Sequence, residues 1–462
     1  MCQGAISGGR AREVTREIGR KTISASESSI LGEGATRMVL GESSFYYDLE
    51  TMPLEARQKY SNEKLRWIVK HAYEQAPAVR AKMDTAGVGP EDIRSLKDLE
   101  KIPITSKDDL VGLQKKNPPF GGFVTVSPNR LQSICMSPGP IYNSPGNDDT
   151  YLRRVEQSYF GCGLRPGDIL VNTFSYHMSP MGILLDTPMK RFGVTVIPMG
   201  GGNKQLQVQV LKDLQVTVFT GTAGFLLEVL QTAETMGYNP RKDFALRLAI
   251  TPLDHGLMKV IERDYGIRVT EFYGTADVGI VAYNCDARSG MHFCEDVIVE
   301  IVDINTGIQL GPGNVGMVVL TPLDSTVPLI RFSPGDLSSW DDRPCSCGRT
   351  SLKLNPIVGW MGEALKVRGM FVHPSQLAHV VGKYAEIGRY QLVCRTVDGK
   401  DFLTFCYEAR EDLQGRSDME ESFRGVFRDV CRLNLDRIEC VSAGSMEAAA
   451  KPIADERPEG GV

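Results

Sequence analysis

The stretch VTVFTGTAGFLLEVLQTAETMG, residues 216–237, joins a short apolar run to an amphipathic segment. The first part has the length and the β-branched residues of a buried strand, and the second repeats apolar residues at helical spacing. Comparable strand-like runs precede it at 168–174 (DILVNTF) and 194–199 (VTVIPM), and another follows at 246–251 (LRLAIT). Strands that alternate with helices are typical of a βαβ sheet. The sequence therefore predicts an α/β fold between residues 166 and 330.

The regions around this stretch differ in character. Residues 1–45 are rich in Gly, Ser, Arg and Glu without a persistent apolar period, which predicts a flexible extension. The sequence of residues 46–361 predicts one large N-terminal domain of several subdomains. Helical patterns and the βαβ sheet come first, and a β-rich portion follows after residue 295. Residues 362–462 mix strand patterns with one long helical pattern at 419–435, so they predict a small α+β domain after a hinge.

The bulk composition limits the kinds of partner. The chain has 462 residues, of which 42% are hydrophobic and 24% charged, and its formal net charge is −5. A slightly acidic chain without a dense Lys/Arg cluster lacks the electrostatic footprint for nucleic acid or an anionic membrane. The sequence has no apolar run of ~18 residues and no apolar segment near its start, so it predicts neither a membrane span nor an export signal. We expect a cytoplasmic protein with reduced cysteines and a small-molecule partner.

Three motifs occur in order in the second half of the chain. EFYGTADVG (271–279) resembles the pattern Y-G-x-T/S-E, and LIRFSPGDLSSW (329–340) resembles R-Y-x-T-G-D-L. The stretch 345–377 contains CSCGRT and RGMFVHPSQ, which resemble C-x-C-G-R-T and R-G-x-x-x-x-P-S-Q. This order and spacing resemble the phenylacetate–CoA ligase branch of the adenylate-forming (acyl-CoA synthetase) superfamily, over roughly residues 46–456.

The resemblance implies a two-step ligase. A carboxylate attacks the α-phosphate of ATP, giving an acyl-adenylate and pyrophosphate, and the thiol of CoA then displaces AMP. The small C-terminal domain is implied to be mobile and to rotate between the steps. The expected acid is aromatic or a related hydrophobic one, the expected cofactors are ATP/AMP, Mg²⁺ and CoA, and a homodimer is expected by analogy. Two other functions stay open: a divergent member that binds acyl-CoA, nucleotide or a protein partner without ligase activity, and an adenylyltransferase that does not use CoA.

The resemblance also implies a set of nucleotide-binding residues. Asp336 matches the Asp that accepts hydrogen bonds from the ribose hydroxyls, and Arg349 matches an Arg near the ribose. Tyr273 would lie against the adenine. The stretch QSICMSPGPIYNSPGND (132–148) stands where the family has its phosphate-binding loop. The predicted nucleotide-binding residues are Ser137, Gly139, Tyr273, Gly274, Thr275, Asp336 and Arg349.

The phosphate-handling residues depart from the family pattern at four places, and two of these lie in the large domain's loops. The loop at 132–148 has three prolines, which lack the N–H that would face a phosphate. Asp277, the predicted catalytic acid that helps to hold Mg²⁺, replaces a Glu, so the metal must sit closer or accept a bridging water. Ala276 replaces a residue with a hydroxyl group.

The other two departures lie at the hinge and near the C-terminus. Trp360 stands where an Arg normally reaches the nucleotide. Ala449 replaces a Lys that steadies the transition-state phosphate, and losing such a cation typically lowers the rate by ~10²–10³. Lys451, two residues later, is the predicted substitute and a second predicted catalytic residue, although a Lys near a chain end is more often a solvated charge.

The acyl and CoA sites are predicted from two further matches. FSYHMSP (174–180) and IPMGGGNKQ (197–205) fall where the family lines its carboxylate site, so the predicted acyl pocket contains Tyr176, His177 and Gly200. The RGMFVHPSQ match makes Arg368 and Gly369 the predicted CoA-binding residues, because the fork of an Arg side chain suits phosphate.

A separate group of three cysteines and one histidine has the residue types of a metal site. Cys285, His292, Cys345 and Cys347 supply three thiols and one imidazole, a full tetrahedral set for structural Zn²⁺. Cys294 is an alternative ligand, and four buried side chains without metal are the other interpretation. Some members of the resembled branch carry a zinc knuckle at the corresponding place.

Overall fold

The computed structural model describes residues 44–137, 139–144, 148–252, 255–303, 306–360, 365–368, 370–372, 374–410, 416–431, 433–442, 444–446 and 451–458. The predicted extension, residues 1–45, lies almost wholly outside this range. So do the predicted CoA-binding residue Gly369 and the departure at Ala449.

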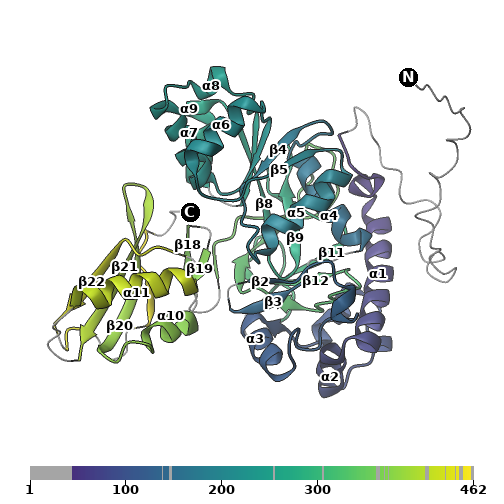
Figure 1. Ribbon diagram of the computed structural model, residues 1–462. Helices are drawn as coiled ribbons and strands as arrows, with labels where there is room; N and C mark the ends of the chain where they lie inside the picture. Colours follow the sequence, from purple (N-terminus) through teal and green to yellow (C-terminus); the bar gives the residue numbers. More distant parts are fainter. Residues whose placement is uncertain are drawn as a thin grey trace, which may run out of the picture.

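A nine-stranded sheet forms the centre of the large domain (Figure 1). Its strands, in spatial order, are β15 (Trp340–Asp341), β16 (Lys353–Leu354), β10 (Met291–Phe293), β9 (Gly279–Asn284), β8 (Arg268–Thr275), β7 (Leu248–Pro252), β6 (Val218–Thr220), β4 (Ile169–Asn172) and β5 (Thr195–Pro198). The pairs from β5 to β8 are parallel and the pairs from β8 to β15 are antiparallel. The opening stretch forms β6 and α7 (Ala223–Thr235), so the α/β prediction is confirmed.

Helices connect and cover these strands. In this part of the chain they are α4 (Asp149–Gly161), α5 (Pro180–Arg191), α6 (Lys204–Asp213), α7, α8 (Pro240–Asp243) and α9 (His255–Tyr265). The second apolar core lies here, between α6, α7, α9 and the sheet. A parallel sheet needs such crossover helices, because parallel neighbours cannot be joined by tight hairpins.

The N-terminal region adds helices that enclose the first and largest core. They are η1 (Asp48–Thr51), α1 (Leu54–Gln75), α2 (Pro77–Ala86), η2 (Pro90–Asp92), η3 (Leu96–Lys101), α3 (Lys107–Lys116) and η4 (Pro128–Arg130). In α1 the apolar residues at helical spacing, Leu65, Ile68, Val69 and Ala72, are buried as their pattern predicts. The N-terminus of α3 is closed by a capping box, in which Ser106 and Asp109 bond to each other's backbone N–H.

A six-stranded sheet lies beside the first one. Its strands are β1 (Thr105–Ser106), β13 (Phe332–Ser333), β12 (Gly316–Pro322), β14 (Asp336–Ser338) and β17 (Gly359–Trp360), with β11 (Val297–Val302) also paired to β12. Because β1 pairs in parallel with β13, the start of α3 lies next to the segment that leads to Asp336. A separate hairpin, β2 (Cys135–Ser137) and β3 (Ile141–Asn143), forms from the stretch predicted to be the phosphate loop.

The C-terminal part has its own core and forms a separate lobe in Figure 1. It contains the hairpin β18 (Leu365–Val367) and β19 (Met370–Val372), helices α10 (Pro374–Val381) and α11 (Arg416–Cys431), and a sheet of β22 (Arg437–Val441), β21 (Lys400–Ala409), β20 (Ile387–Val397) and β23 (Ile453–Asp455). Stacked rings of Phe405 and Phe423, 4.2 Å between centroids, lie in that core. The predicted boundary after residue 361 falls at 361–364, outside the described residues, and stays a prediction.

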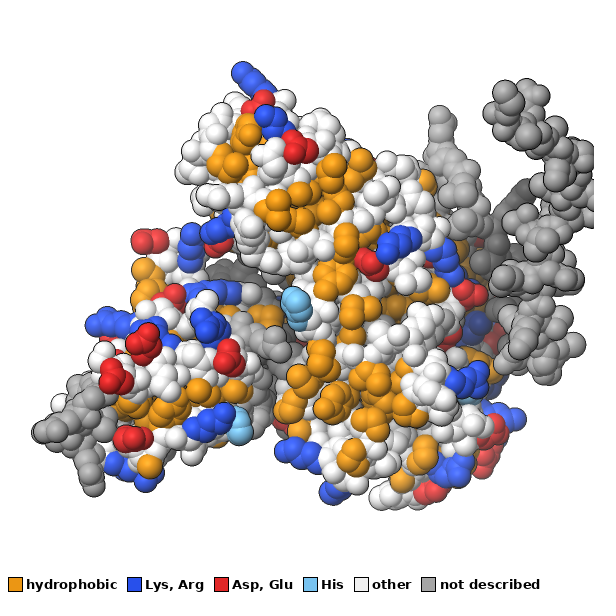
Figure 2. All heavy atoms as spheres, viewed as in Figure 1, with side chains coloured by type: hydrophobic (Ala, Val, Ile, Leu, Met, Phe, Trp, Pro, Cys, Tyr) orange, Lys and Arg blue, Asp and Glu red, His pale blue; other side chains and the backbone are white. Residues whose placement is uncertain are grey.

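The surface agrees with the composition. On the face shown in Figure 2, Lys and Arg side chains are scattered among Asp and Glu rather than gathered into one basic area. Among the described helices, none has the length together with the apolar character that crossing a membrane requires.

Candidate active site

Two of the predicted nucleotide-binding residues meet at the end of β8. The Tyr273 hydroxyl donates a 2.6 Å hydrogen bond to Oδ2 of Asp336, the first residue of β14. Burial raises the pKa of Asp336, while this hydrogen bond and the nearby Lys366 and Lys107 oppose the increase. Lys366 belongs to β18, so a cation of the C-terminal lobe lies near a carboxylate of the large domain. The two motifs that were matched separately therefore form one site.

Asp277 lies in the turn that follows β8, and its carboxylate is fully buried. Nζ of Lys107 lies 3.3 Å from Asp277 Oδ2, but neither carboxylate oxygen has a hydrogen-bond partner among the described residues. A buried carboxylate without hydrogen bonds is costly, and here it marks a place for a further cation or donor.

Lys107 belongs to this site, although no sequence motif points to it. It is the first residue of α3, and it lies close enough to influence both Asp277 and Asp336. The only local signal is the SKDD capping box, which predicts a helix start but gives no hint of which carboxylates face it.

The turn between β8 and β9 explains why Asp277 points inward. A Cβ at Gly274 would lie 2.8 Å from the carbonyl oxygen of Gly279, so only glycine permits this close approach of the two strands. The Thr275 hydroxyl accepts a hydrogen bond from the Val278 N–H at 3.1 Å and closes the turn. Gly274 and Thr275 thus shape the site, and their contact with a nucleotide stays a prediction.

The predicted phosphate loop is a short hairpin held at both sides. Ser137 is buried, and its Oγ accepts a 2.8 Å hydrogen bond from Asn143 Nδ2. Gln114 of α3 makes two 2.8 Å hydrogen bonds to the backbone of Tyr142, which tie the hairpin to the helix that carries Lys107. At Gly139 a Cβ would lie 2.8 Å from Ile141 Cγ1, so glycine is required there. Phosphate contacts of Ser137 and Gly139 stay predictions.

Arg349 contacts the face of the central sheet opposite to Tyr273. Phe272 pairs with Tyr283 and Tyr273 pairs with Ala282, so Tyr273 and Tyr283 point to opposite faces of the sheet. Tyr273 bonds to Asp336, whereas Nε of Arg349 donates to the Tyr283 hydroxyl at 3.1 Å. The prediction that Arg349 borders the ribose thus has no support in this geometry.

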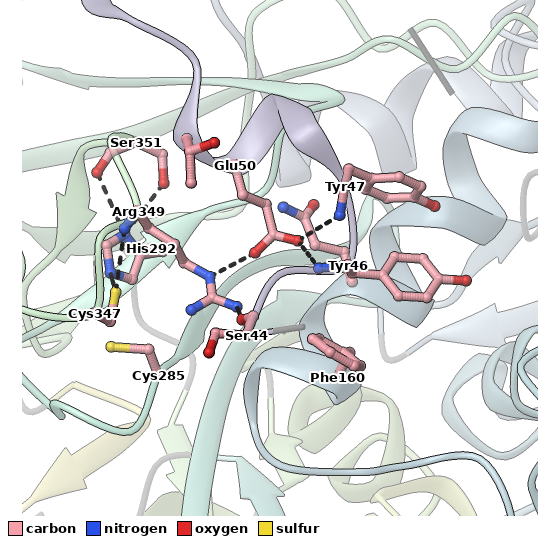
Figure 3. Close-up of polar contacts among 12 residues, drawn as sticks. Ser44, Tyr46, Tyr47, Glu50, Phe160, Cys285, His292, Cys347, Arg349 and Ser351 are labelled. Atoms are coloured by element: carbon pink, nitrogen blue, oxygen red, sulfur yellow. Dashed lines mark hydrogen bonds and ion pairs between the residues drawn. The ribbon is translucent and has the colours of Figure 1, made fainter. Parts of the chain in front are cut away.

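Arg349 instead holds the N-terminal turn (Figure 3). Its Nε lies 2.6 Å from Glu50 Oε2, and its other end donates to the Ser44 carbonyl at 3.0 Å. Glu50 is fully buried, and its Oε1 accepts hydrogen bonds from the backbone N–H groups of Tyr46 and Tyr47. A buried ion pair with its remaining lone pairs occupied has a structural role.

The predicted acyl-pocket residues gather at the carboxyl end of β4. Asn172 Nδ2 donates to the Tyr176 hydroxyl at 2.9 Å, and the Asn172 carbonyl accepts from Gly200 N at 3.0 Å. The Tyr176 hydroxyl donates to Asp186, and burial followed by that carboxylate raises the pKa of Tyr176. His177 is exposed, and its backbone N–H donates to Ser175 Oγ at 3.2 Å. Substrate contacts of Tyr176, His177 and Gly200 stay predictions.

The C-terminal lobe holds the remaining predicted residues. The Arg368 guanidinium pairs with Asp436 and donates to the carbonyls of Asp401 (2.7 Å) and Asn434 (3.2 Å). Lys451 is exposed, and its carbonyl accepts a 2.9 Å hydrogen bond from Gln391. These contacts fix both residues to their own lobe and leave the CoA-binding and catalytic roles as predictions.

The four predicted metal ligands converge. Their donor atoms all lie within 4.8 Å of one another, with Cys285 Sγ 3.6 Å from Cys345 Sγ and Cys347 Sγ 3.4 Å from His292 Nε2. A tetrahedral zinc with bonds of about 2.3 Å to sulfur and about 2.0 Å to nitrogen has ligand separations of about 3.5 Å between sulfur and nitrogen and about 3.8 Å between two sulfurs, which these distances approach. Cys294 is not part of this group.

The neighbours of the cluster suit a metal ligand set. Nδ1 of His292 lies 3.2 Å from Ser351 Oγ, which leaves Nε2 directed at Cys347 (Figure 3). Burial, assisted by Arg349, lowers the pKa of His292 to about 4, so the imidazole is neutral, as ligation requires.

Comparisons with known proteins show the family of the chain. No family model matches the sequence. The phenylacetate-coenzyme A ligase of Thermus thermophilus is 31% identical over 363 residues, which cover 75% of this chain and 80% of the relative. The Escherichia coli phenylacetate-coenzyme A ligase is 30% identical and covers 79% of this chain and 85% of its own length.

Solved structures show the same fold. A 2-hydroxyisobutyryl-CoA ligase in its thioesterification state, bound to an acyl-AMP and CoA, superposes with a TM-score of 0.84 at 24% identity, covering 90% of this chain and 94% of the other. The open and postadenylation states of that ligase, which cover 89–90% of this chain and 93–95% of theirs, give TM-scores of only 0.67. From the sequence relatives and the shared fold, the chain belongs to the phenylacetate–CoA ligase family of AMP-forming acid–CoA ligases.

Proposed function

We propose that this protein activates an aromatic or related hydrophobic carboxylic acid with ATP and transfers it to CoA. The observation that carries the proposal is the convergence of Asp336, Tyr273, Asp277 and Lys107 at the carboxyl end of β8. Ligands of open α/β sheets bind at this edge. Relatives named phenylacetate-coenzyme A ligase make phenylacetate the first acid to test.

Each of these residues has a role that its chemistry supports. The Asp336 carboxylate accepts hydrogen bonds from the ribose hydroxyls, and Tyr273 holds that carboxylate in place. Lys107 pairs with Asp277, and its charge also opposes the rise that burial causes in the pKa of Asp336. It binds phosphate oxygens and aligns the α-phosphate with the incoming carboxylate. Since Lys107 belongs to the large domain, this cation does not depend on where the C-terminal lobe lies.

The position of the C-terminal lobe supports a two-step cycle. The higher TM-score with the thioesterification state than with the open and postadenylation states favours the arrangement of the second step. We infer that the lobe, residues 362–462, rotates, and that Lys451 acts in the other arrangement. We propose that Arg368 and Gly369 border CoA in the second step.

Two metals fit the residues present. Asp277, whose buried oxygens lack hydrogen-bond partners among the described residues, is the ligand for Mg²⁺. When bound, Mg²⁺ supplies charge neutralisation for the phosphates. Cys285, His292, Cys345 and Cys347 hold a structural Zn²⁺, since a closed set of four ligands leaves no open coordination position.

The location and assembly of the protein are inferred from the family. We infer a cytoplasmic enzyme and a homodimer, both by analogy with the branch. Size-exclusion chromatography with light scattering measures the assembly directly.

The function is tested by pyrophosphate release from ATP over a panel of acids, with and without CoA. We expect phenylacetate or a related acid to give pyrophosphate release, and CoA thiol to be consumed in equal amount. Asp336→Asn should raise KM for ATP, whereas Asp342→Asn, an exposed acid nearby in sequence, should not. Pyrophosphate release without thiol consumption would favour the CoA-independent adenylyltransferase, and no release with any acid would favour the binding role.

A further inference from the structure

A small polar cavity lies beside Asp277. Asp277, Asp324, Tyr151 and Ser144 are among the residues that line it, and it offers about 10 Å³ to the centre of a water molecule. A space of roughly 10–15 Å³ holds one water or one small ion. The cavity is thus of a size for a single ion with oxygen ligands.

Asp324 presents its carboxylate from the loop after β12. It is 5% exposed, and its Oδ1 accepts hydrogen bonds from the backbone N–H groups of Thr326 (2.7 Å) and Val327 (3.4 Å). These bonds fix the orientation of the carboxylate and use one oxygen.

Tyr151 gives a second and independent sign of a ligand. Its side chain is 3% exposed, and its hydroxyl has no hydrogen-bond partner among the described residues. The Tyr151 ring packs directly against Gly279, since a Cβ at that position would lie only 2.9 Å from the ring atom Cε2. This close packing keeps the ring from turning away from the cavity. A buried phenol held against a cavity without a partner indicates a polar occupant, such as a metal-bound water.

The local charges also favour a cation. Asp277 and Asp324 both line the cavity, and a buried guanidinium close to Asp324, that of Arg154, donates to the carbonyls of Val278 (3.0 Å) and Ile280 (3.2 Å). Lys107 pairs with one oxygen of Asp277. The two carboxylates of the cavity thus face the ammonium of Lys107 and one guanidinium that is also bonded to backbone.

We propose that Asp324 and Asp277 together hold the divalent cation of this site, with the Tyr151 hydroxyl donating to a water of its shell. The proposal deepens the proposed function and rests on it, since the cation serves the same phosphates. Two carboxylates explain how the shorter Asp277 suffices where the family has Glu, because Asp324 supplies a second anchor from the facing loop. The protein then binds the cation before the nucleotide arrives.

The experiment uses Mn²⁺ alone as the probe, with purified full-length protein and no nucleotide. Free Mn²⁺ is followed by electron paramagnetic resonance, and Mn²⁺ prefers oxygen ligands, so it does not compete for the thiolate cluster. We expect one equivalent to bind. Asp324→Asn, which keeps the shape and an acceptor oxygen, should raise the Kd about tenfold or more, and Tyr151→Phe should raise it a few-fold.

The matched control is Asp149→Asn. Asp149 begins the helix that carries Tyr151, but its carboxylate is exposed and pairs with Arg191. The Kd of the Asp149→Asn variant for Mn²⁺ should therefore equal that of the wild type. An unchanged Kd in Asp324→Asn, or a wild-type protein that binds no Mn²⁺, overturns the proposal. If Asp324→Asn fails to fold by circular dichroism, Tyr151→Phe decides in the same way. Ligase activity at saturating Mg²⁺ is assayed separately, so failure of the proposed function is distinguished from failure of this one.

Discussion

At the scale of single residues, Lys107 stands out because its position is electrostatically unfavourable without a partner. It begins α3, and the positive end of a helix dipole disfavours a cation there. Asp277, 3.3 Å away, offsets this, and the phosphates of a bound nucleotide would do so more strongly. The residue is therefore placed for an anion.

Replacing Lys107 by Met should slow adenylation by roughly 10²–10³, the usual loss when one preorganised donor is removed. Transfer to CoA from a supplied acyl-adenylate should change much less. Lys107→Arg should recover part of the loss, and Lys116→Met, at the exposed end of the same helix, should have no effect. Equal slowing of both half-reactions in Lys107→Met would contradict a phosphate role.

Arg349→Met tests whether Arg349 borders the ribose, as the motif predicts, or holds the N-terminal turn. It leaves Glu50 buried without its cation, so we expect a loss of about 3–5 kcal/mol of stability in denaturant unfolding. The double variant with Glu50→Gln should recover part of that loss. The KM for ATP of the folded protein should not change, and a large increase in it with normal stability would restore the ribose role.

Lys82 gives a prediction of pH dependence. Burial, and then the charge of Arg331, lowers the pKa of Lys82 to about 7 from its ordinary 10.5. Between pH 7 and pH 10.5 the unfolded chain binds more protons than the folded protein. The stability of the wild type should therefore rise with pH relative to that of Lys82→Met, by up to about 5 kcal/mol. Below pH 7 the folded protein bears the full cost of burying a charged Lys82. Urea unfolding of both proteins at pH 7, 8.5 and 10 measures the difference, and a pH-independent difference would contradict it.

The sequence predicted some of these residues and not others for physical reasons. Tyr273 and Asp336 lie in motifs whose side chains meet, so matching each motif was enough. Lys107 reaches the site because β1 pairs with β13, more than 220 residues further along the chain, and no local pattern encodes that pairing. Arg349 also lies in a matched motif, but the alternation of sheet faces and the distant Glu50 decide where it points.

At the scale of elements, α3 links the parts of the site. Its first residue faces Asp277, and Gln114 in its last turns holds the backbone of β3. The hairpin therefore cannot shift without pulling on the helix that carries Lys107. Helix and strand types were predictable here from period and capping, whereas this contact depends on tertiary packing.

Ser106→Ala tests whether the capped start of α3 is needed for adenylation. Loss of the cap should lower stability by about 1 kcal/mol and also slow adenylation, because the first turn positions Lys107. Asn239→Ala removes the cap of α8 and should lower stability without slowing adenylation. Equal effects of the two variants on adenylation would mean that the first turn of α3 does not position the catalytic cation.

At the scale of the whole molecule, the cysteine–histidine cluster joins distant parts of the chain. Metal analysis should give about one zinc per chain, and Cys345→Ala should lower it. Removal of zinc by a chelator should lower the Tm by several degrees and expose the turn at residues 44–52 to proteases, because Arg349 and Thr350 of the adjoining segment hold that turn. Unchanged protease sensitivity after full zinc removal would separate the turn from the metal.

The contact between that turn and the metal loop also has a consequence for synthesis on the ribosome. Thr350 and Glu50 are 300 residues apart. At about 5–20 residues per second, the turn emerges roughly 15–60 seconds before the segment that covers it. During this interval the Glu50 carboxylate and the rings of Tyr46 and Tyr47 are not yet covered by the segment that buries them, so the large domain closes only after residue 350 has been synthesised.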